Sequence, residues 1–143
     1  MMIVDGKDLV LGRLASFAAK RLLEGEKVTI LNAEHVVVSG RSDSTVELYR
    51  AWLGTRNVAN PRRGPIHLKR PEDLVRRSVR GMLPFSRARG IEAYRGLRVY
   101  VGVPEEFSGK ETVPVPGAGL QGLGTRRYIR VGDLSKQLGG SYK

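Results

Sequence analysis

The first 31 residues change hydrophobic period twice, and each period predicts a different element. The apolar run at residues 2–4 ends at Asp5-Gly6, which predicts a buried strand closed by a turn. Apolar residues then recur at helical spacing over residues 9–23, and Gly25 follows as a helix stop. Residues 27–31 are unbroken and rich in β-branched side chains, which predicts a second buried strand. Strand, helix and strand in about thirty residues form a βαβ unit, whose strands are expected to be parallel with a right-handed crossover.

A third β-rich run, at residues 35–38, ends at Ser39-Gly40 and predicts another strand. Ser42 or Asp43 can then cap a helix, because their side-chain oxygens accept hydrogen bonds from the backbone N–H groups of a first turn. We expect this helix to carry Val46, Leu48, Tyr49 and Trp52.

Periodicity is lost between residues 54 and 68, where Asn, Gly and Pro residues mark a basic loop. A helix is predicted from Pro71, because proline is tolerated in a first helical turn and the pair Glu72-Asp73 suits a helix N-terminus. Pro84 is expected to end this helix, with Met82 and Leu83 buried. Its apolar face is expected to hold Leu74, Val75, Ser78, Val79 and Met82.

The remaining chain predicts shorter elements around one irregular segment. Residues 87–94 predict a short helix, and residues 97–101 predict a further strand. Residues 109–124 hold five glycines and two prolines, with too little apolar content for a core element, so we expect an extended arm. Residues 128–138 predict a strand and a short helix with Val131, Leu134 and Leu138 facing inward.

Charge indicates the class of partner. Lysine and arginine number 25 against 14 acids, which gives a net charge of +11 and a pI near 10.6. Such an excess points to a polyanion, and 18 of the cations are arginine, whose planar guanidinium pairs with phosphate and stacks on bases. Between Arg56 and Arg98, twelve cations stand against three acids, a local balance of +9. We therefore expect nucleic acid as the partner, and no membrane, since neither a long basic amphipathic helix nor a spanning apolar run is present.

The sharpest basic pattern is Asn60-Pro-Arg-Arg-Gly-Pro65, whose prolines lower the entropy lost when the loop is ordered on a polyanion. A mobile, solvated charge run is the alternative, and we favour phosphate contact. Few aromatic residues lie in the basic segment, so recognition of folded RNA by shape and backbone is expected to outweigh base stacking. The candidate RNA-binding residues are Arg41, Arg56, Asn60, Arg62, Arg63, His67, Lys69, Arg70, Arg76, Arg77, Arg80, Arg87, Arg89 and Arg95.

No pattern predicts catalysis, a cofactor or a metal site. Gly6 and Gly12 lie between a strand and a helix, but their spacing and the following Arg13-Leu14 do not fit a phosphate-binding loop, so a tight turn is the preferred explanation. His35 and His67 have no ligand-spaced partners, and we expect His67 to meet RNA rather than a metal. The absence of cysteine excludes disulfides and fits a reducing cytoplasm.

The segment Val79-Arg-Gly-Met-Leu-Pro84 is the most specific motif of the chain. Together with Gly90, Leu97, Val99, Tyr100 and Gly102 it resembles the signature of the ribosomal protein L13 family. The N-terminal half agrees at Val4-Asp-Gly6, Leu11-Gly-Arg-Leu-Ala-Ser16, Leu31-Asn-Ala-Glu34 and Val38-Ser-Gly40. The likeness covers about residues 3–104, and the loop at residues 60–65 resembles the archaeal or eukaryotic branch.

The resemblance implies a three-layer α/β/α fold with a central four-stranded parallel sheet, plus an extended C-terminal arm. Residues 1–104 would form the α/β rRNA-binding domain, and residues 105–143 an arm and a short C-terminal element packed on it. It further implies a structural constituent of the large ribosomal subunit in the cytoplasm, which contacts large-subunit rRNA and neighbouring ribosomal proteins and supports assembly. No enzyme activity, cofactor or small-molecule substrate is implied.

Two alternatives stay open at this point. A free RNA-binding regulator of translation would present the same basic face. A nucleotide-dependent enzyme on a Rossmann-like sheet is the least favoured, because a fold alone does not imply a function.

Overall fold

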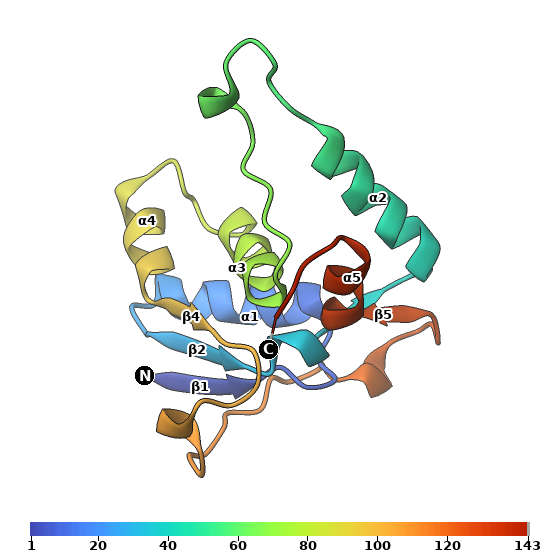
Figure 1. Ribbon diagram of the computed structural model, residues 1–143. Coiled ribbons are helices and arrows are strands. Elements are labelled where there is room, and N and C mark those ends of the chain that lie inside the picture. Colours follow the sequence, from blue (N-terminus) through green and yellow to red (C-terminus); the bar gives the residue numbers. More distant parts are fainter. Residues whose placement is uncertain (143) are drawn as a thin grey trace.

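The computed structural model describes residues 1–142, which alternate between short strands and helices (Figure 1). The strands of this part of the chain are β1 (Met2–Asp5), β2 (Val28–Leu31), β3 (Val37–Ser39), β4 (Leu97–Val99) and β5 (Tyr128–Arg130). The α-helices are α1 (Leu11–Leu23), α2 (Ser42–Gly54), α3 (Pro71–Gly81), α4 (Ala88–Arg95) and α5 (Val131–Gln137). Single turns of 3-10 helix complete it: η1 (Ala33–His35), η2 (Pro61–Arg63), η3 (Glu105–Phe107) and η4 (Leu120–Gly122).

The centre of the fold is a parallel sheet in the order β1-β2-β4. Val4 lies opposite Ile30, and Ile30 lies opposite Val99. The segment from β1 through α1 to β2 is the predicted βαβ unit, and the prediction of parallel strands is confirmed. α1 ends as predicted, because Gly25 has a φ of +92°, a backbone conformation that other residues rarely adopt.

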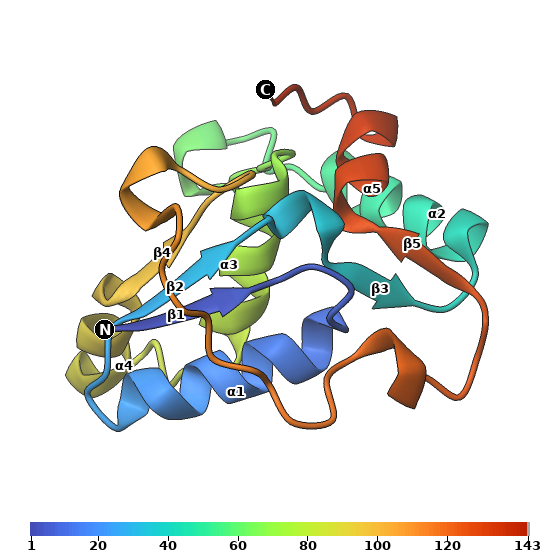
Figure 2. The ribbon, with the colours of Figure 1, turned by 90° about the horizontal axis from the view of Figure 1, so that it is seen from below.

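The two faces of this sheet are covered differently. Val4 and Ile30 point into the main core, which α1 and α3 complete. On the other face Ile3 and Leu31 pack against Phe107 of η3. Figures 1 and 2 show α1, α3 and α4 on one side of the sheet and the chain around η3 crossing the other. The mixed α/β class is confirmed, whereas the second face carries a 3-10 turn and extended chain in place of the expected helical layer.

The expected fourth strand of the central sheet is absent among residues 1–142. β3 follows β2 after only the single turn η1, so it lies past the end of the sheet and not beside it (Figure 2). A chain needs about a dozen residues or more to return beside a parallel strand, and η1 is too short for this. β3 instead pairs antiparallel with β5, where Val38 lies opposite Ile129, and meets the continuation of β1 at one parallel bridge between Val10 and Val37.

α3 begins at Pro71 as predicted and buries Leu74, Val75 and Val79. The prediction of a buried Met82 was wrong. The helix ends at Gly81, so Met82 is the C-cap residue and its side chain is 45% exposed. Leu83 is buried, as expected.

Residues 105–142 return across the body and do not extend from it. The N–H of Val113 donates to the carbonyl oxygen of Ile3 at 2.7 Å, and that of Val10 donates to Ala118 at 2.8 Å. Val115 and Ala118 are buried in the main core, so the expectation that the Gly/Pro-rich segment supplies no core residues was wrong. The division of the chain at residue 104 stays a prediction. β5 and α5 confirm the predicted strand and helix, with the inward residues Val131, Leu134 and Leu138 buried.

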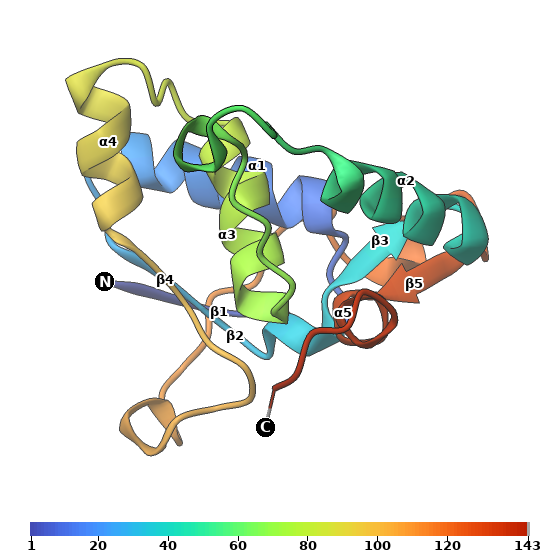
Figure 3. The same ribbon diagram turned by 45° about the horizontal axis from the view of Figure 1, so that its top comes forward.

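α2 buries only Val46 and lies at the edge of the molecule (Figure 3). Its N-cap is Arg41, with no side-chain cap, so the prediction that Ser42 or Asp43 caps the helix was wrong by one or two residues. Among the described helices, none is long and apolar enough to cross a membrane.

Candidate nucleic-acid interface

The arginines of α3 lie on the face of the helix that the core does not use. Leu74 and Val79 point into the core, and helical geometry then directs residues 76, 77 and 80 outward. Arg77 and Arg80 are exposed, and Arg76 is half-buried. The three arginines therefore share the side of α3 that faces away from the core.

Each of these arginines lies over an aromatic ring. The guanidinium carbon of Arg77 is 3.8 Å from the ring centre of Trp52, and that of Arg80 is 4.1 Å from Phe85. Arg76 lies 5.4 Å from the ring of Tyr94. A ring beneath a guanidinium attracts its charge and restricts its side chain, which otherwise carries about 2 kcal/mol of rotamer entropy. The positive groups are held in place without being neutralised by carboxylates.

The basic loop and α3 enclose a groove of about 800 Å³. The loop leaves α2, projects from the body and returns beside α3 (Figures 1 and 3). We call this hollow the arginine groove. Its lining residues are Gly64, Pro65, Ile66, Leu68, Asp73, Arg76, Arg77, Arg80, Gly81, Leu83, Phe85 and Tyr94.

The base of the loop is closed by internal contacts. The Nε2 atom of His67 lies 2.6 Å from the carbonyl oxygen of Thr55, and its ring meets that of Trp52 edge-on at 4.6 Å. At the tip, the N–H of Asn60 donates to the side-chain oxygen of Asn57 at 3.1 Å. These contacts fix where the loop crosses α3, while the side chains of Arg62 and Arg63 stay exposed.

The aromatic wall beyond α3 depends on a close backbone approach at Gly90. A β-carbon at this position would collide with the carbonyl group of Pro84, so only glycine lets α4 lie against that turn. The rings of Phe85 and Tyr94 then meet edge-on at 5.5 Å. Gly90 thus keeps the rings under Arg80 and Arg76 together.

Tyr49 lies on the α2 side of the same region, near Arg77. Burial raises the pKa of the Tyr49 hydroxyl above its ordinary value, and the positive charge of Arg77 lowers it by less. Tyr49 is therefore a neutral, packed side chain at neutral pH and adds no negative charge to the region.

Comparison with known proteins identifies the family. The model of the ribosomal protein L13 family matches residues 1–106. This chain belongs to the ribosomal protein L13 family. Its relatives include archaeal proteins named large ribosomal subunit protein uL13. The protein of Methanococcoides burtonii is 44% identical over 99% of this chain and all of its own length. That of Methanocaldococcus jannaschii is 41% identical over 99% of this chain and all of its own length.

Membership confirms the family resemblance and the prediction that the chain is not an enzyme. A third relative, from Methanosphaera stadtmanae, is 44% identical over 98% of both chains. These relatives match beyond residue 104, so the C-terminal segment also belongs to the shared sequence and the likeness is longer than the motifs indicated.

The predicted site residues fall into several groups. Arg76, Arg77 and Arg80 meet at the arginine groove, and the loop residues Arg56, Asn60, Arg62 and Arg63 are exposed beside it. His67 contacts the carbonyl oxygen of Thr55 and the ring of Trp52 within the protein. Contact of all fourteen predicted residues with RNA stays a prediction.

The other predicted cations lie apart from the groove lining. Arg70 pairs with Glu72 at 3.6 Å, and Lys69 precedes it on the way into α3. Arg89 and Arg95 line a second hollow between α4 and the end of α1, where Arg89 donates to the carbonyl of Leu23 at 3.2 Å. The remaining two are the N-cap residues of α4 and α2, namely Arg87 and Arg41.

Sequence reasoning missed the aromatic rings that lie under the arginines. Trp52 is the only tryptophan of the chain and lies in another helix, so no local spacing linked it to Arg77. The exposed pair Arg126-Arg127 was also missed, although two adjacent arginines were a sufficient signal for a basic patch.

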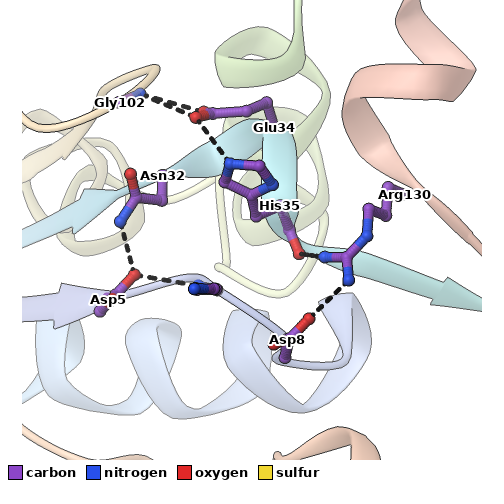
Figure 4. Close-up of polar contacts among 8 residues, drawn as sticks. Asp5, Asp8, Asn32, Glu34, His35, Gly102 and Arg130 are labelled. Carbon is purple, nitrogen blue, oxygen red and sulfur yellow. Dashed lines mark hydrogen bonds and ion pairs between the residues drawn. The ribbon is translucent and has the colours of Figure 1, made fainter.

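The carboxyl end of the parallel sheet, where open α/β folds bind ligands, is occupied by internal contacts here (Figure 4). Asp5 accepts hydrogen bonds from the side chain of Asn32 at 2.8 Å and from the N–H of Lys7 at 3.0 Å. Glu34 accepts from the N–H of Gly102, and Asp8 pairs with Arg130 at 2.8 Å. The carboxylates at this edge therefore connect the ends of β1 and β2 to β5 and to the chain that follows β4.

Proposed function

We propose that this chain is a structural constituent of the large ribosomal subunit and binds large-subunit rRNA through the arginine groove and the adjoining loop. The observation that carries the proposal is the set of Arg76, Arg77 and Arg80 on one helix face, each held on a ring and none in an ion pair with any residue from 1 to 142. The names of the relatives supply the ribosomal context.

The physical role of such a face is to let RNA backbones approach each other. Phosphates that converge at a junction repel each other, and physiological salt screens this repulsion only beyond about 8 Å. Fixed guanidinium groups supply the missing positive charge with directed hydrogen bonds. Binding at such a junction would favour the folded RNA and so support assembly.

The loop would add a second contact, because Arg62 and Arg63 lie exposed beyond the groove. Arg87, Arg89 and Arg95 on and before α4 would extend the contact on the other side of Phe85. If about six to ten phosphates are contacted, affinity falls by about 10³ to 10⁵ between 50 and 200 mM salt on the relation for duplex DNA. Neighbouring ribosomal proteins would use the surface that RNA leaves uncovered.

The test is association of a tagged chain with large subunits in cell lysate. After a high-salt wash and a sucrose gradient, the unmodified chain is expected at one copy per large subunit. Reversing charge with Arg62→Glu and Arg63→Glu is expected to lower retention without unfolding the domain.

A charge-matched control is Lys7→Glu with Lys110→Glu, since both lysines are exposed and neither lines the arginine groove. This control is expected to stay with the subunits. Recovery of the unmodified chain only in light, RNA-containing fractions would contradict the ribosomal role and favour a free RNA-binding regulator.

A further inference from the structure

The arginine groove contains one carboxylate among its cations. Asp73 lines it together with Arg76, Arg77 and Arg80. A groove built only for phosphate gains nothing from a carboxylate, because phosphate and carboxylate repel each other. Asp73 lies in the first turn of α3, where a carboxylate favours the helix N-terminus. Its place in the groove also presents a hydrogen-bond acceptor to a ligand group that donates hydrogen bonds.

Asp73 is also without an ion-pair partner where one is expected. Arg76 and Arg77 follow it by three and four residues, the spacing at which opposite charges pair on a helix. Both guanidinium groups lie over rings instead, at 5.4 Å from Tyr94 and 3.8 Å from Trp52. No hydrogen bond or ion pair within residues 1–142 involves the Asp73 carboxylate, which is half-buried.

The arginines beside it offer flat surfaces. A guanidinium that lies over a ring on one side can stack a second flat group on its other side, and RNA-binding proteins use arginine planes in this way. Arg77 and Arg80 are exposed and line the same groove as Asp73. The Nε atom of Arg76 is buried and has no partner in the described chain, so one donor at the groove also lacks an acceptor.

Size and lining agree with a base as the occupant. The groove of about 800 Å³ is large enough to hold a base together with its sugar and phosphate. Ile66, Leu83 and Phe85 give it apolar surface beside the charged groups. A phosphate group gains nothing from contact with apolar surface. A base, in contrast, can pack its face on the apolar residues and form hydrogen bonds at its edges with the charged ones.

We propose that the arginine groove holds one nucleobase turned out of an RNA helix, stacked on the Arg77 and Arg80 guanidinium planes and hydrogen-bonded by the Asp73 carboxylate. Guanine is the favoured base, because its Watson–Crick edge presents two adjacent N–H donors to the two acceptor oxygens of a carboxylate. This inference rests on the proposed function and makes one RNA contact specific for a base, beyond the backbone contacts expected from the sequence.

The experiment uses the full chain and three fluorescein-labelled RNA hairpins with the same stem. One stem is fully paired, one carries a single bulged G and one a single bulged U. Fluorescence anisotropy over a salt series gives the affinities. Trp52, the only tryptophan, lies under Arg77, so its own fluorescence reports a base entering the groove.

Asp73→Asn is the test variant, and Glu72→Gln is its matched control. Both acids lie in the first turn of α3, and both changes remove one charge from the helix N-terminus. Glu72 pairs with Arg70 and is not part of the groove lining. Glu72 therefore shares the first helical turn with Asp73 but has no access to the groove.

The unmodified chain is expected to bind the bulged-G hairpin about tenfold more tightly than the bulged-U hairpin, the discrimination typical of a bidentate base contact. Trp52 fluorescence is expected to be quenched most by the bulged-G hairpin. Asp73→Asn is expected to reduce the preference to within about twofold, whereas Glu72→Gln keeps it.

Equal, salt-dependent binding of the three hairpins would overturn the inference and leave the proposed function standing, with phosphate as the occupant. A preference that survives Asp73→Asn, or that Glu72→Gln also removes, would overturn it as well. Failure of every hairpin to bind in a salt-dependent manner would instead contradict the proposed function.

Discussion

Two charged regions of this protein use the same side-chain types in opposite ways. At the carboxyl end of the sheet, Asp8 is held by Arg130 at 2.8 Å and Glu34 by the N–H of Gly102 (Figure 4). In the arginine groove, Arg77 and Arg80 lie over aromatic rings and have no carboxylate partner in the described chain. Charges that are paired inside a protein connect its elements, whereas charges that are positioned but unpaired are available to a ligand.

The comparison also separates stability from binding. Breaking a contact at the sheet edge should change the free energy of unfolding and leave RNA affinity alone. Removing a groove arginine should weaken RNA binding far more than it lowers stability, because it breaks no internal ion pair and loses only a cation–π contact of about 0.5–1 kcal/mol.

Replacing Arg77 and Arg80 with glutamate is expected to weaken binding to a large-subunit rRNA fragment by about 100-fold or more at moderate salt. Each change removes one charge-assisted hydrogen bond, worth about 1.5–3 kcal/mol, and adds a repulsive charge. The slope of log affinity against log salt should become shallower by about two. A filter-binding salt series measures both quantities, with Lys7→Glu and Lys110→Glu as the charge-matched control. Equal losses in the two double variants would show that net charge, and not the groove, determines binding.

Arg130→Ala is expected to lower the free energy of unfolding by about 1–2 kcal/mol and to leave RNA affinity within about twofold. The change removes the ion pair to Asp8 and the hydrogen bond to the carbonyl of His35. Urea denaturation measures the loss. Arg21→Ala is the comparison, since it breaks a surface pair with Glu24 and should cost about 0.5 kcal/mol or less. A stability loss no larger than that of Arg21→Ala would show that the contacts of Arg130 at the sheet edge stabilise the fold no more than an exposed ion pair does.

Arg77→Lys keeps the positive charge but loses the planar group above Trp52. Affinity is expected to fall by about two- to fivefold, because the lysine ammonium lacks the planar fork that pairs with two phosphate oxygens at once and stacks on a base. The salt slope should stay unchanged, because the number of charges is the same. An affinity equal to that of the unmodified chain would show that the ring under Arg77 has no part in positioning it for RNA.

Tyr49→Phe is expected to have the smallest effect, and only in alkaline solution. Because burial raises the pKa of Tyr49, the folded chain keeps this proton while the unfolded chain loses it above the ordinary tyrosine pKa of 10.0. Stability contributed by Tyr49 is therefore present below pH 10 and is lost as the pH rises further. Urea denaturation at pH 8 and at pH 10.5 should show a smaller alkaline loss of stability for Tyr49→Phe than for the unmodified chain. If Tyr49→Phe loses as much stability between pH 8 and pH 10.5 as the unmodified chain, groups other than Tyr49 cause the alkaline loss.

The family, the βαβ unit and the start of α3 were accessible from the sequence because they depend on local signals. Strand and helix periodicity, Pro71 at a helix start and Gly25 past a helix end act within one or two turns of chain. The prediction of a four-stranded central sheet was wrong because the sheet order depends on contacts between segments distant in sequence. Whether β3 lies beside β1 or past it depends on the length of η1 and on β5, which lies about ninety residues later in the chain.

The sequence by itself determined that this is a basic member of the ribosomal protein L13 family, and that its arginines gather between residues 56 and 98. Only the tertiary structure decided which arginines lie over aromatic rings and which carboxylates form internal ion pairs or hydrogen bonds. Trp52, Phe85 and Tyr94 come from separate elements and reach α3 through packing, which no sequence period records. Side-chain direction is fixed by contacts distant in sequence, so the chemistry of the groove exists only in the folded chain.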